Sequence, residues 1–224
     1  MLFYLKRNLI NLIKKNDHIK GFTKSIISLM LLPISYITIA RESRKERIYL
    51  EIGSGAKKGS NGWITLDSGF QADIHWDLRN GIPFPDESLD KIYTSHTFEH
   101  IPFNDLKKVI QLCYKKLKKG GTLSVCVPNA RNYIKSYIEG NRFIDLYDES
   151  KVSPSSRCDT GSLIDQVNLI AYLGGQHCYM FDQENLINIL KASGFEFAKA
   201  RGFEEGLDLK ERDHESIYAI AIKE

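Results

Sequence analysis

Apolar residues in the first 47 positions form two stretches of different character. Leu2, Leu5, Leu9, Leu12 and Ile13 recur at helical spacing, and the other face carries six basic and amide residues: Lys6, Arg7, Asn8, Asn11, Lys14 and Lys15. This pattern predicts a basic amphipathic helix over residues 2–15. An uncharged run follows from residue 25 to residue 40. Its helical length would be about 24 Å, short of the roughly 30 Å hydrocarbon core, so we expect no membrane span.

This N-terminal extension allows two interpretations. In the first, its helices pack on the core of the protein, and the basic face of residues 2–15 is solvated. In the second, residues 2–15 lie on an anionic membrane as a peripheral anchor. A cleaved signal peptide fits poorly, because the charged segment 41–47 follows the apolar run instead of a small-residue cleavage site. We therefore expect a cytoplasmic protein, membrane-associated on the cytoplasmic face only under the second interpretation.

From residue 48 onward, short apolar runs alternate with turns and one clear helical pattern. The predicted strands cover 48–52, 63–67, 73–78, 89–95 and 122–127. Residues 103–117 have helical spacing and end at two lysines and two glycines, which are typical of a helix stop. A helix among short buried strands is compatible with an α/β protein.

Candidate chemistry gathers where these predicted strands end. The first strand runs into Gly53-Ser54-Gly55, a spacing that permits a sharp turn and a close approach to a ligand. Asp67 and Asp77 end the next two strands, and Asp67 stands where an acid can accept the hydroxyls of a ribose. Either acid could instead serve a turn or cap a helix. The third glycine of a dinucleotide-binding fingerprint is missing, since position 58 is a lysine.

Composition and charge exclude several classes of protein. Hydrophobic residues make up 42% and charged residues 26% of the 224 positions, which excludes a collagen, a disordered chain and a bundle of membrane spans. The four cysteines form no CxxC pair, so we expect reduced thiols. Residues 1–47 carry a net charge of +7 and the remainder −4, which gives the main body no basic field for nucleic acid.

Taken together and in order, these motifs resemble those of the class I S-adenosylmethionine-dependent methyltransferases. The likeness is greatest to the type 11 group and, within it, to a subgroup of predicted bacterial methyltransferases. The segments that carry the resemblance are 50–55, 62–67, 77–78, 82–90, 96–100, 117–123 and 127–129, with weaker likeness from 176 to 223.

The resemblance implies a Rossmann-like, mostly parallel seven-stranded sheet. Only residues 53–62 separate the first two strands, so the first helix must be shortened. The sheet face that it leaves bare could be covered by residues 25–40. We therefore expect a helical extension over 1–47 and a methyltransferase domain over 48–224, with a lid-like insertion at about 131–180.

By position, the resemblance also implies an S-adenosylmethionine site. Asp67 would accept the ribose hydroxyls, and Asp77 with Leu78 would hold the adenine. Glu51 would fix the glycine loop near the amino group of the cofactor. The rest of the implied site consists of the loop beneath the methionine moiety and the residues that face the methyl group: Gly53, Ser54, Gly55, Ser95 and His96. One departure is Lys57, which stands where the family has a further glycine.

A hydroxyl acceptor would need a base, and histidine is the natural candidate near neutral pH. His96 leads because it follows the fourth strand directly; His177 is second and His214 third. Four side chains of the insertion could contact the acceptor or could simply be exposed loop residues: Tyr133, Tyr137, Arg142 and Arg157.

Residues 96–100 also match HxxEH, an inverted zinc-protease motif. That chemistry needs both histidines on a stable helix and a third ligand. Here a strand runs directly into His96 and Pro102 follows at once. We therefore predict no metal site and no requirement for a divalent ion.

The sequence thus predicts methyl transfer from S-adenosylmethionine to a small-molecule or lipid-linked sugar acceptor, as in bacterial surface polysaccharide biosynthesis. Two alternatives stay open: a nicotinamide-dependent oxidoreductase, and a non-catalytic, membrane-associated module that binds S-adenosylmethionine. No nucleic acid partner is expected.

Overall fold

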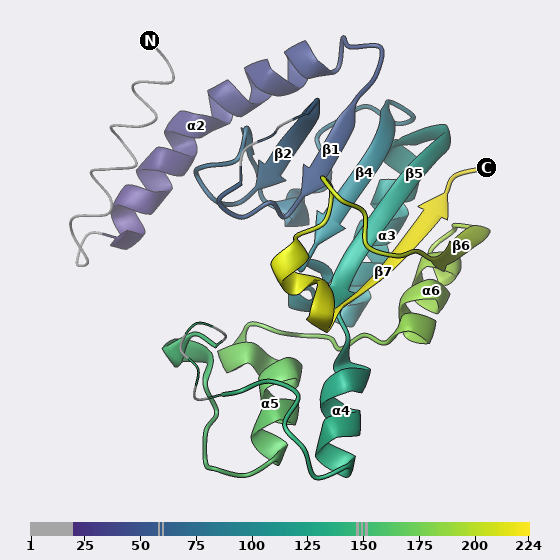
Figure 1. The fold of residues 1–224 in the computed structure, drawn as a ribbon. Helices are drawn as coiled ribbons and strands as arrows, with labels where there is room; N and C mark the ends of the chain where they lie inside the picture. Colours follow the sequence, from purple (N-terminus) through teal and green to yellow (C-terminus); the bar gives the residue numbers. More distant parts are fainter. Residues whose placement is uncertain (1–19, 58, 60, 147, 149, 151) are drawn as a thin grey trace.

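The computed structural model describes residues 20–57, 59, 61–146, 148, 150 and 152–224. Its strands are β1 (Tyr49–Ile52), β2 (Trp63–Asp67), β3 (Ile74–His75), β4 (Leu89–Ser95), β5 (Leu117–Pro128), β6 (Phe197–Ala200) and β7 (Ser216–Ile222). They form one sheet in the order β3-β2-β1-β4-β5-β7-β6 (Figure 1). β7 runs antiparallel to β5 and β6, and β1 to β5 pair in parallel. The predicted α/β fold with a mostly parallel seven-stranded sheet is confirmed.

The centre of the sheet is buried on both faces. Leu50, Ile52, Ile92, Leu123 and Val125 have no exposed surface, as expected for parallel strands that are covered by helices. α3 (Phe103–Lys116) and α6 (Gln183–Ala192) lie behind the sheet in Figure 1. The helix predicted for 103–117 is therefore confirmed to within one residue.

Two strands differ in length from their predictions. β3 has two residues rather than the six of 73–78, because Asp77 ends the extended segment and caps a 3₁₀ turn at Leu78–Asn80. β5 begins at Leu117, five residues earlier than predicted. The two glycines near its start remain in the strand because neighbouring chain segments pair with them, as when Gly120 N–H donates to Lys223 O at 2.7 Å.

α2 (Lys20–Glu42) packs along β3 at one edge of the sheet (Figure 1). Its buried residues recur every four positions at Ile27, Leu31, Ser35 and Ile39, so that they form one stripe. Ser35 Oγ donates to His75 O at 3.1 Å and accepts from His75 N–H at 3.0 Å. The apolar stripe and this paired hydrogen bond together attach the helix to the edge strand.

In the connection between β1 and β2, the described residues form bends, turns and irregular backbone. The helix that we expected to be short is missing from these described residues. The basic helix predicted for residues 2–15 lies outside the described residues. None of the helices in the described part combines the length and apolarity needed to cross a membrane.

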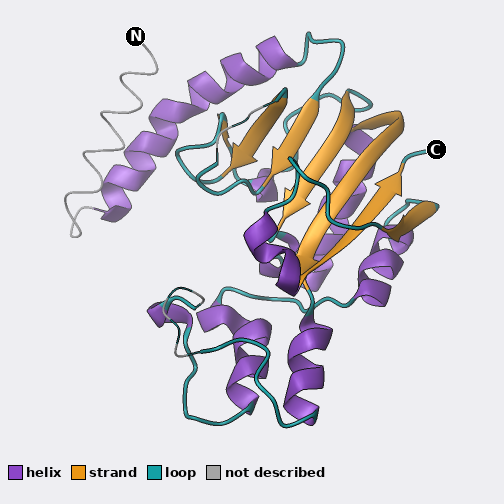
Figure 2. Cartoon of the chain, viewed as in Figure 1, coloured by secondary structure: helices purple, strands orange, loops and turns teal. Residues whose placement is uncertain are grey.

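The segment between β5 and α6 folds as a unit with its own small core. It contains α4 (Ala130–Ile138) and α5 (Ile164–Tyr172), and it starts and ends where Asn129 pairs with Phe181. The core includes Tyr133, Leu146 and Leu169. The unit lies beyond the carboxyl ends of the parallel strands (Figure 2), where open α/β sheets bind ligands.

Candidate functional site

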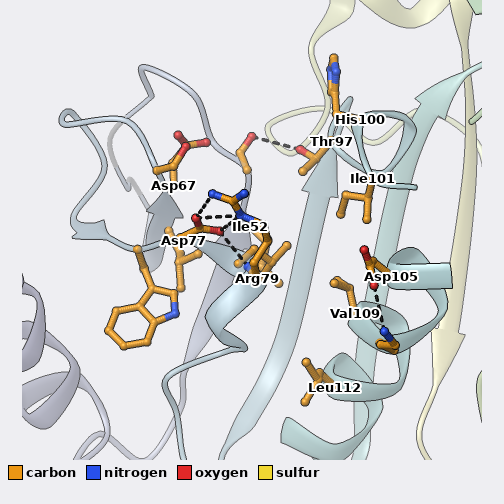
Figure 3. A pocket seen from close by; sticks show the side chains of 16 residues that line it. Ile52, Asp67, Asp77, Arg79, Thr97, His100, Ile101, Asp105, Val109 and Leu112 are labelled. Carbon is orange, nitrogen blue, oxygen red and sulfur yellow. Dashed lines mark hydrogen bonds and ion pairs between the residues drawn. The ribbon is translucent and has the colours of Figure 1, made fainter. Parts of the chain in front are cut away.

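A first cavity of about 620 Å³ opens at the carboxyl ends of β1 and β2. Gly53, Asp67, Asp77 and Leu78 line one side of it. Residues that follow β4, together with residues of α3, line the other side: Thr97, His100, Ile101, Asp105, Lys108, Val109 and Leu112. Figure 3 shows the side with Asp67 and Asp77 facing the side that carries His100 and α3.

The glycine loop is shaped by a close contact with the chain that follows β4. Gly53 has φ +70°, and a Cβ atom there would lie 2.1 Å from Thr97 Oγ1. Thr97 Oγ1 donates to Gly53 O at 3.2 Å, while Gly53 N–H donates to Leu66 O at 2.8 Å. Position 53 therefore has no room for a larger residue. The two hydrogen bonds hold the loop against the ends of both neighbouring strands.

Asp67 organises this loop and still faces the cavity. Its Oδ2 accepts the N–H of Gly55 at 2.9 Å, and its Oδ1 accepts the N–H of Gly69 at 2.6 Å. An ionised carboxylate offers about four acceptor positions, so two remain for a ligand. The carboxylate can therefore hold the loop and accept ligand hydroxyls at the same time.

Asp77 caps a turn and also lines the first cavity. It caps the 3₁₀ turn by accepting the N–H of Arg79 at 2.9 Å, and with Leu78 it lines the cavity. Its carboxylate also accepts from the Arg79 guanidinium, at 2.9 Å from Nε (Figure 3). This bond is the largest cause that lowers the pKa of Asp77 below its usual value, so the group is an anion at neutral pH.

Four further residues of the predicted cofactor site lie outside the lining of this cavity in the described structure: Glu51, Ser54, Gly55 and Ser95. Glu51 is buried in β1, and Lys57 Nζ donates to its carboxylate at 2.9–3.1 Å. Lys57, the residue that departs from the family pattern, therefore pairs with the carboxylate that the resemblance places near the amino group of the cofactor. Any ammonium group of a ligand would have to compete with it.

A second cavity of about 410 Å³ lies between the sheet edge and the insertion. Its polar lining residues come from distant parts of the chain and include His96, Tyr133, His177, Arg212 and Glu215. The linings of the two cavities contact each other at two histidines. His100 lines the first and His177 the second, and their ring centroids are 4.9 Å apart.

His96 lines the second cavity as predicted. Its backbone has φ +48°, and its side chain is only 4% exposed. Nε2 lies 2.8 Å from Ser216 Oγ, and Nδ1 lies 3.5 Å from Glu99 Oε1. Burial lowers the pKa of His96 to about 3, so the imidazole is neutral at physiological pH. Burial has the opposite effect on the carboxyl group of Glu99, whose pKa it raises to about 8.

The other residues predicted to contact the acceptor or to act as the base differ in whether they line the second cavity. Tyr133 lines the second cavity, and its hydroxyl donates to Glu215 Oε2 at 3.0 Å. The remaining candidates lie outside its described lining: Tyr137, Arg142, Arg157 and His214. His214 is exposed and stacks on Phe143 instead, with ring centroids 6.3 Å apart.

Several lining residues were not recognised from the sequence. Arg212 and Glu215 precede β7, and because β7 is antiparallel, its beginning lies at the carboxyl edge; Ser216 is in register with Pro128. The direction of this last strand is the signal that could have identified them. Glu99 and His100 belong to the HxxEH segment that was set aside. Together with His177 they bring potential ligand atoms for a metal ion within 4.8 Å of one another.

A family model described as a methyltransferase domain matches residues 37–200. The chain belongs to this methyltransferase family. The match begins inside α2 and ends with β6, so it covers both cavities apart from the segment before β7. A comparison with curated proteins finds no significant match.

Among solved structures, this methyltransferase is similar to several with low sequence identity. One is an S-adenosylmethionine-dependent methyltransferase from Archaeoglobus fulgidus, 17% identical over 89% of this chain and 94% of that one, with a TM-score of 0.48. Another, from Thermotoga maritima, is 15% identical over 92% and 97%, with a TM-score of 0.49. A third is phosphoethanolamine N-methyltransferase 2 of Haemonchus contortus in complex with S-adenosylmethionine, 13% identical over 84% and 51%, with a TM-score of 0.44.

Proposed function

We propose that this methyltransferase transfers a methyl group from S-adenosylmethionine, bound in the first cavity, to a hydroxyl-bearing acceptor in the second. The observation that carries the proposal is the meeting of the two cavities at His100 and His177, with ring centroids 4.9 Å apart. A donor and an acceptor bound on either side of that point would have their reacting atoms close together. Such positioning is the main task of an enzyme whose methyl donor is already activated.

The first cavity has the division of polar and apolar surface that this donor needs. Asp67 has two free acceptor positions for the ribose hydroxyls, and the anionic Asp77 can accept the exocyclic N–H of adenine. Leu78, Val109 and Leu112 supply apolar surface for the flat base. The loop over Gly53 and Gly55 would pass beneath the methionine moiety.

The second cavity favours a small polar acceptor. Its volume of about 410 Å³ lies within the usual range for small-molecule sites, roughly 300–1,000 Å³. His96, Arg212 and Glu215 offer hydrogen-bonding groups of differing charge, which suit the hydroxyls of a sugar, free or lipid-linked. We propose that methylation of such an acceptor belongs to bacterial surface polysaccharide biosynthesis.

In the reaction, an acceptor hydroxyl oxygen forms a bond to the methyl carbon while the bond from that carbon to sulfur breaks. The products are the methyl ether and S-adenosylhomocysteine. The hydroxyl proton must leave, and His96, which lines the acceptor cavity, is the proposed group to receive it. His177 lines the same cavity and is the second candidate.

Calorimetry with S-adenosylmethionine and with NAD⁺ tests the donor, and we expect binding of the first only. Mass spectrometry with a panel of sugar nucleotides and lipid-linked sugars tests the acceptor, since turnover adds the mass of one methyl group. Binding of NAD⁺ in place of S-adenosylmethionine would favour the oxidoreductase. Cofactor binding without turnover of any acceptor in the panel would favour the non-catalytic module.

A further inference from the structure

Glu99, His100 and His177 form a cluster where the two cavities meet. Glu99 and His100 lie in the 3₁₀ turn Phe98–His100 that follows β4, and His177 lies on the segment returning from the insertion. One potential ligand atom of each lies within 4.8 Å of the others. The HxxEH segment was excluded as a metal site partly because it lacked a third ligand, and the fold brings that ligand from the insertion.

Both imidazoles are held in the tautomer that can bind a metal. His100 Nδ1 is 3.0 Å from Gln176 O, and His177 Nδ1 is 2.7 Å from Ile170 O. A carbonyl oxygen can only accept, so Nδ1 must carry the proton in each ring. In the neutral form of each ring, Nε2 is then unprotonated, with its lone pair free. An imidazole that donates its other N–H to a backbone carbonyl is the usual arrangement of a metal-binding histidine.

Glu99 is a second, independent indication of a bound cation. The residue is 2% exposed, and its Oε2 has no hydrogen-bond partner in the described structure. Within that part of the chain, the groups at ion-pair distance from it are two imidazoles, His96 Nδ1 at 3.5 Å and His100 Nε2 at 3.9 Å. A buried carboxyl oxygen without a partner is costly, and a metal ion would satisfy it.

We propose that Glu99, His100 and His177 bind a divalent transition-metal ion of the zinc class, with one coordination position open toward the acceptor cavity. Two imidazoles and one carboxylate are a donor set that suits zinc, and three protein ligands are typical of its catalytic sites. Bonds of about 2.1 Å would bring the ligand atoms to about 3.5 Å from one another, so a side-chain shift of about 1 Å closes the site. His100 is exposed and offers a path of entry.

The position of the site suggests a role in the proposed reaction. The open position would take the acceptor hydroxyl, and the ion would lower the pKa of that hydroxyl so that its proton leaves more readily before the oxygen is methylated. This role rests on the proposed function, whereas the metal site itself does not. It favours acceptors with a hydroxyl that can reach the junction of the two cavities.

The test is metal binding to the full chain after treatment with a chelator. Zinc affinity is measured by competition with a chromophoric chelator, and cobalt is titrated by visible absorption. We expect one ion per chain and a loss of affinity of at least tenfold in both Glu99→Gln and His177→Gln. His214→Gln removes an exposed histidine outside the cluster and should bind as the unaltered protein does. Circular dichroism establishes whether each variant is folded. If one of the two cluster variants does not fold, the other provides the test.

Each outcome decides between the metal site and the proposed function. Equal zinc affinity in His214→Gln and in a folded cluster variant would overturn the site, as would no tight zinc or cobalt binding by the unaltered protein. Zinc binding without S-adenosylmethionine binding would uphold the site and overturn the proposed function. S-adenosylmethionine binding without zinc binding would overturn the site and leave the proposed function to the turnover experiment.

Discussion

The carboxylate of Asp67 is the group whose removal tests the donor site most directly. It already accepts two backbone N–H groups, from Gly55 at 2.9 Å and Gly69 at 2.6 Å, and it lines the first cavity. Asp67→Asn keeps the shape of the side chain and one oxygen but removes the charge. It also places an amide N–H₂ where two acceptors were. Asp67→Ala removes every acceptor, including the one that orders the glycine loop.

The expected loss follows from the number of charged hydrogen bonds. A hydrogen bond to a charged group contributes about 1.5–3 kcal/mol, and the asparagine oxygen can replace only part of what two ribose hydroxyls would receive. A net loss of about 1.5–3 kcal/mol in Asp67→Asn corresponds to an affinity for S-adenosylmethionine weaker by about 10- to 150-fold. Asp67→Ala should lose at least as much, because Gly55 N–H also loses its partner.

Isothermal titration calorimetry measures this effect, with S-adenosylhomocysteine as a second ligand that shares the ribose. Asp86→Asn is the matched control, because Asp86 pairs with Lys115 and Lys116 away from both cavities. Its removal should leave cofactor affinity unchanged. An unaltered affinity in Asp67→Asn would refute the assignment of this carboxylate to the ribose.

Three further predictions concern stability and the N-terminal extension. Leu31→Ala in α2 should lower the free energy of unfolding by about 2–5 kcal/mol in denaturant titration, because this side chain is 3% exposed against the sheet edge. Leu29→Ala, on the same helix but 70% exposed, should change it by less than about 0.5 kcal/mol, and equal effects would contradict the packing of α2. Asp182 caps α6 through the N–H of Asn185, a bond that lowers its pKa below the usual 3.8, so Asp182→Ala should cost about 0.5–2 kcal/mol above pH 5. The pKa of Asp182 is lower in the folded state than in the unfolded state, so the stability that its carboxylate contributes is lost as the pH falls through the folded-state pKa. The melting temperatures of the unaltered protein and Asp182→Ala should therefore converge below pH 3.8. A difference in melting temperature that widens there would refute the reasoning. Removal of residues 2–15 should weaken binding to anionic liposomes in a salt-sensitive way if they form a peripheral anchor, and unchanged binding would leave them as ordinary packing.

Local patterns in the sequence determined the fold class and several residues that line the first cavity. Buried parallel strands are continuous apolar runs in the sequence. The residues at their carboxyl ends lie at the same edge of the sheet, regardless of the structure of the segments that connect the strands. That rule brought Gly53, Asp67, Asp77 and Leu78 to one cavity before any tertiary contact was known. The helical spacing from residue 103 onward likewise located α3 to within one residue.

Contacts between distant segments were decided only by the tertiary structure. The stripe of Ile27 and Leu31 shows that α2 has a buried face, but periodicity cannot say that this face meets the edge strand β3. His177 reaches Glu99 and His100 only because the insertion returns to β5 where Asn129 pairs with Phe181. The burial that sets the protonation states of His96 and Glu99 comes from the same long-range packing. Spacing along the chain encodes which residues share a strand or a helix face, whereas the distance between two loops depends on how the whole chain closes around its core.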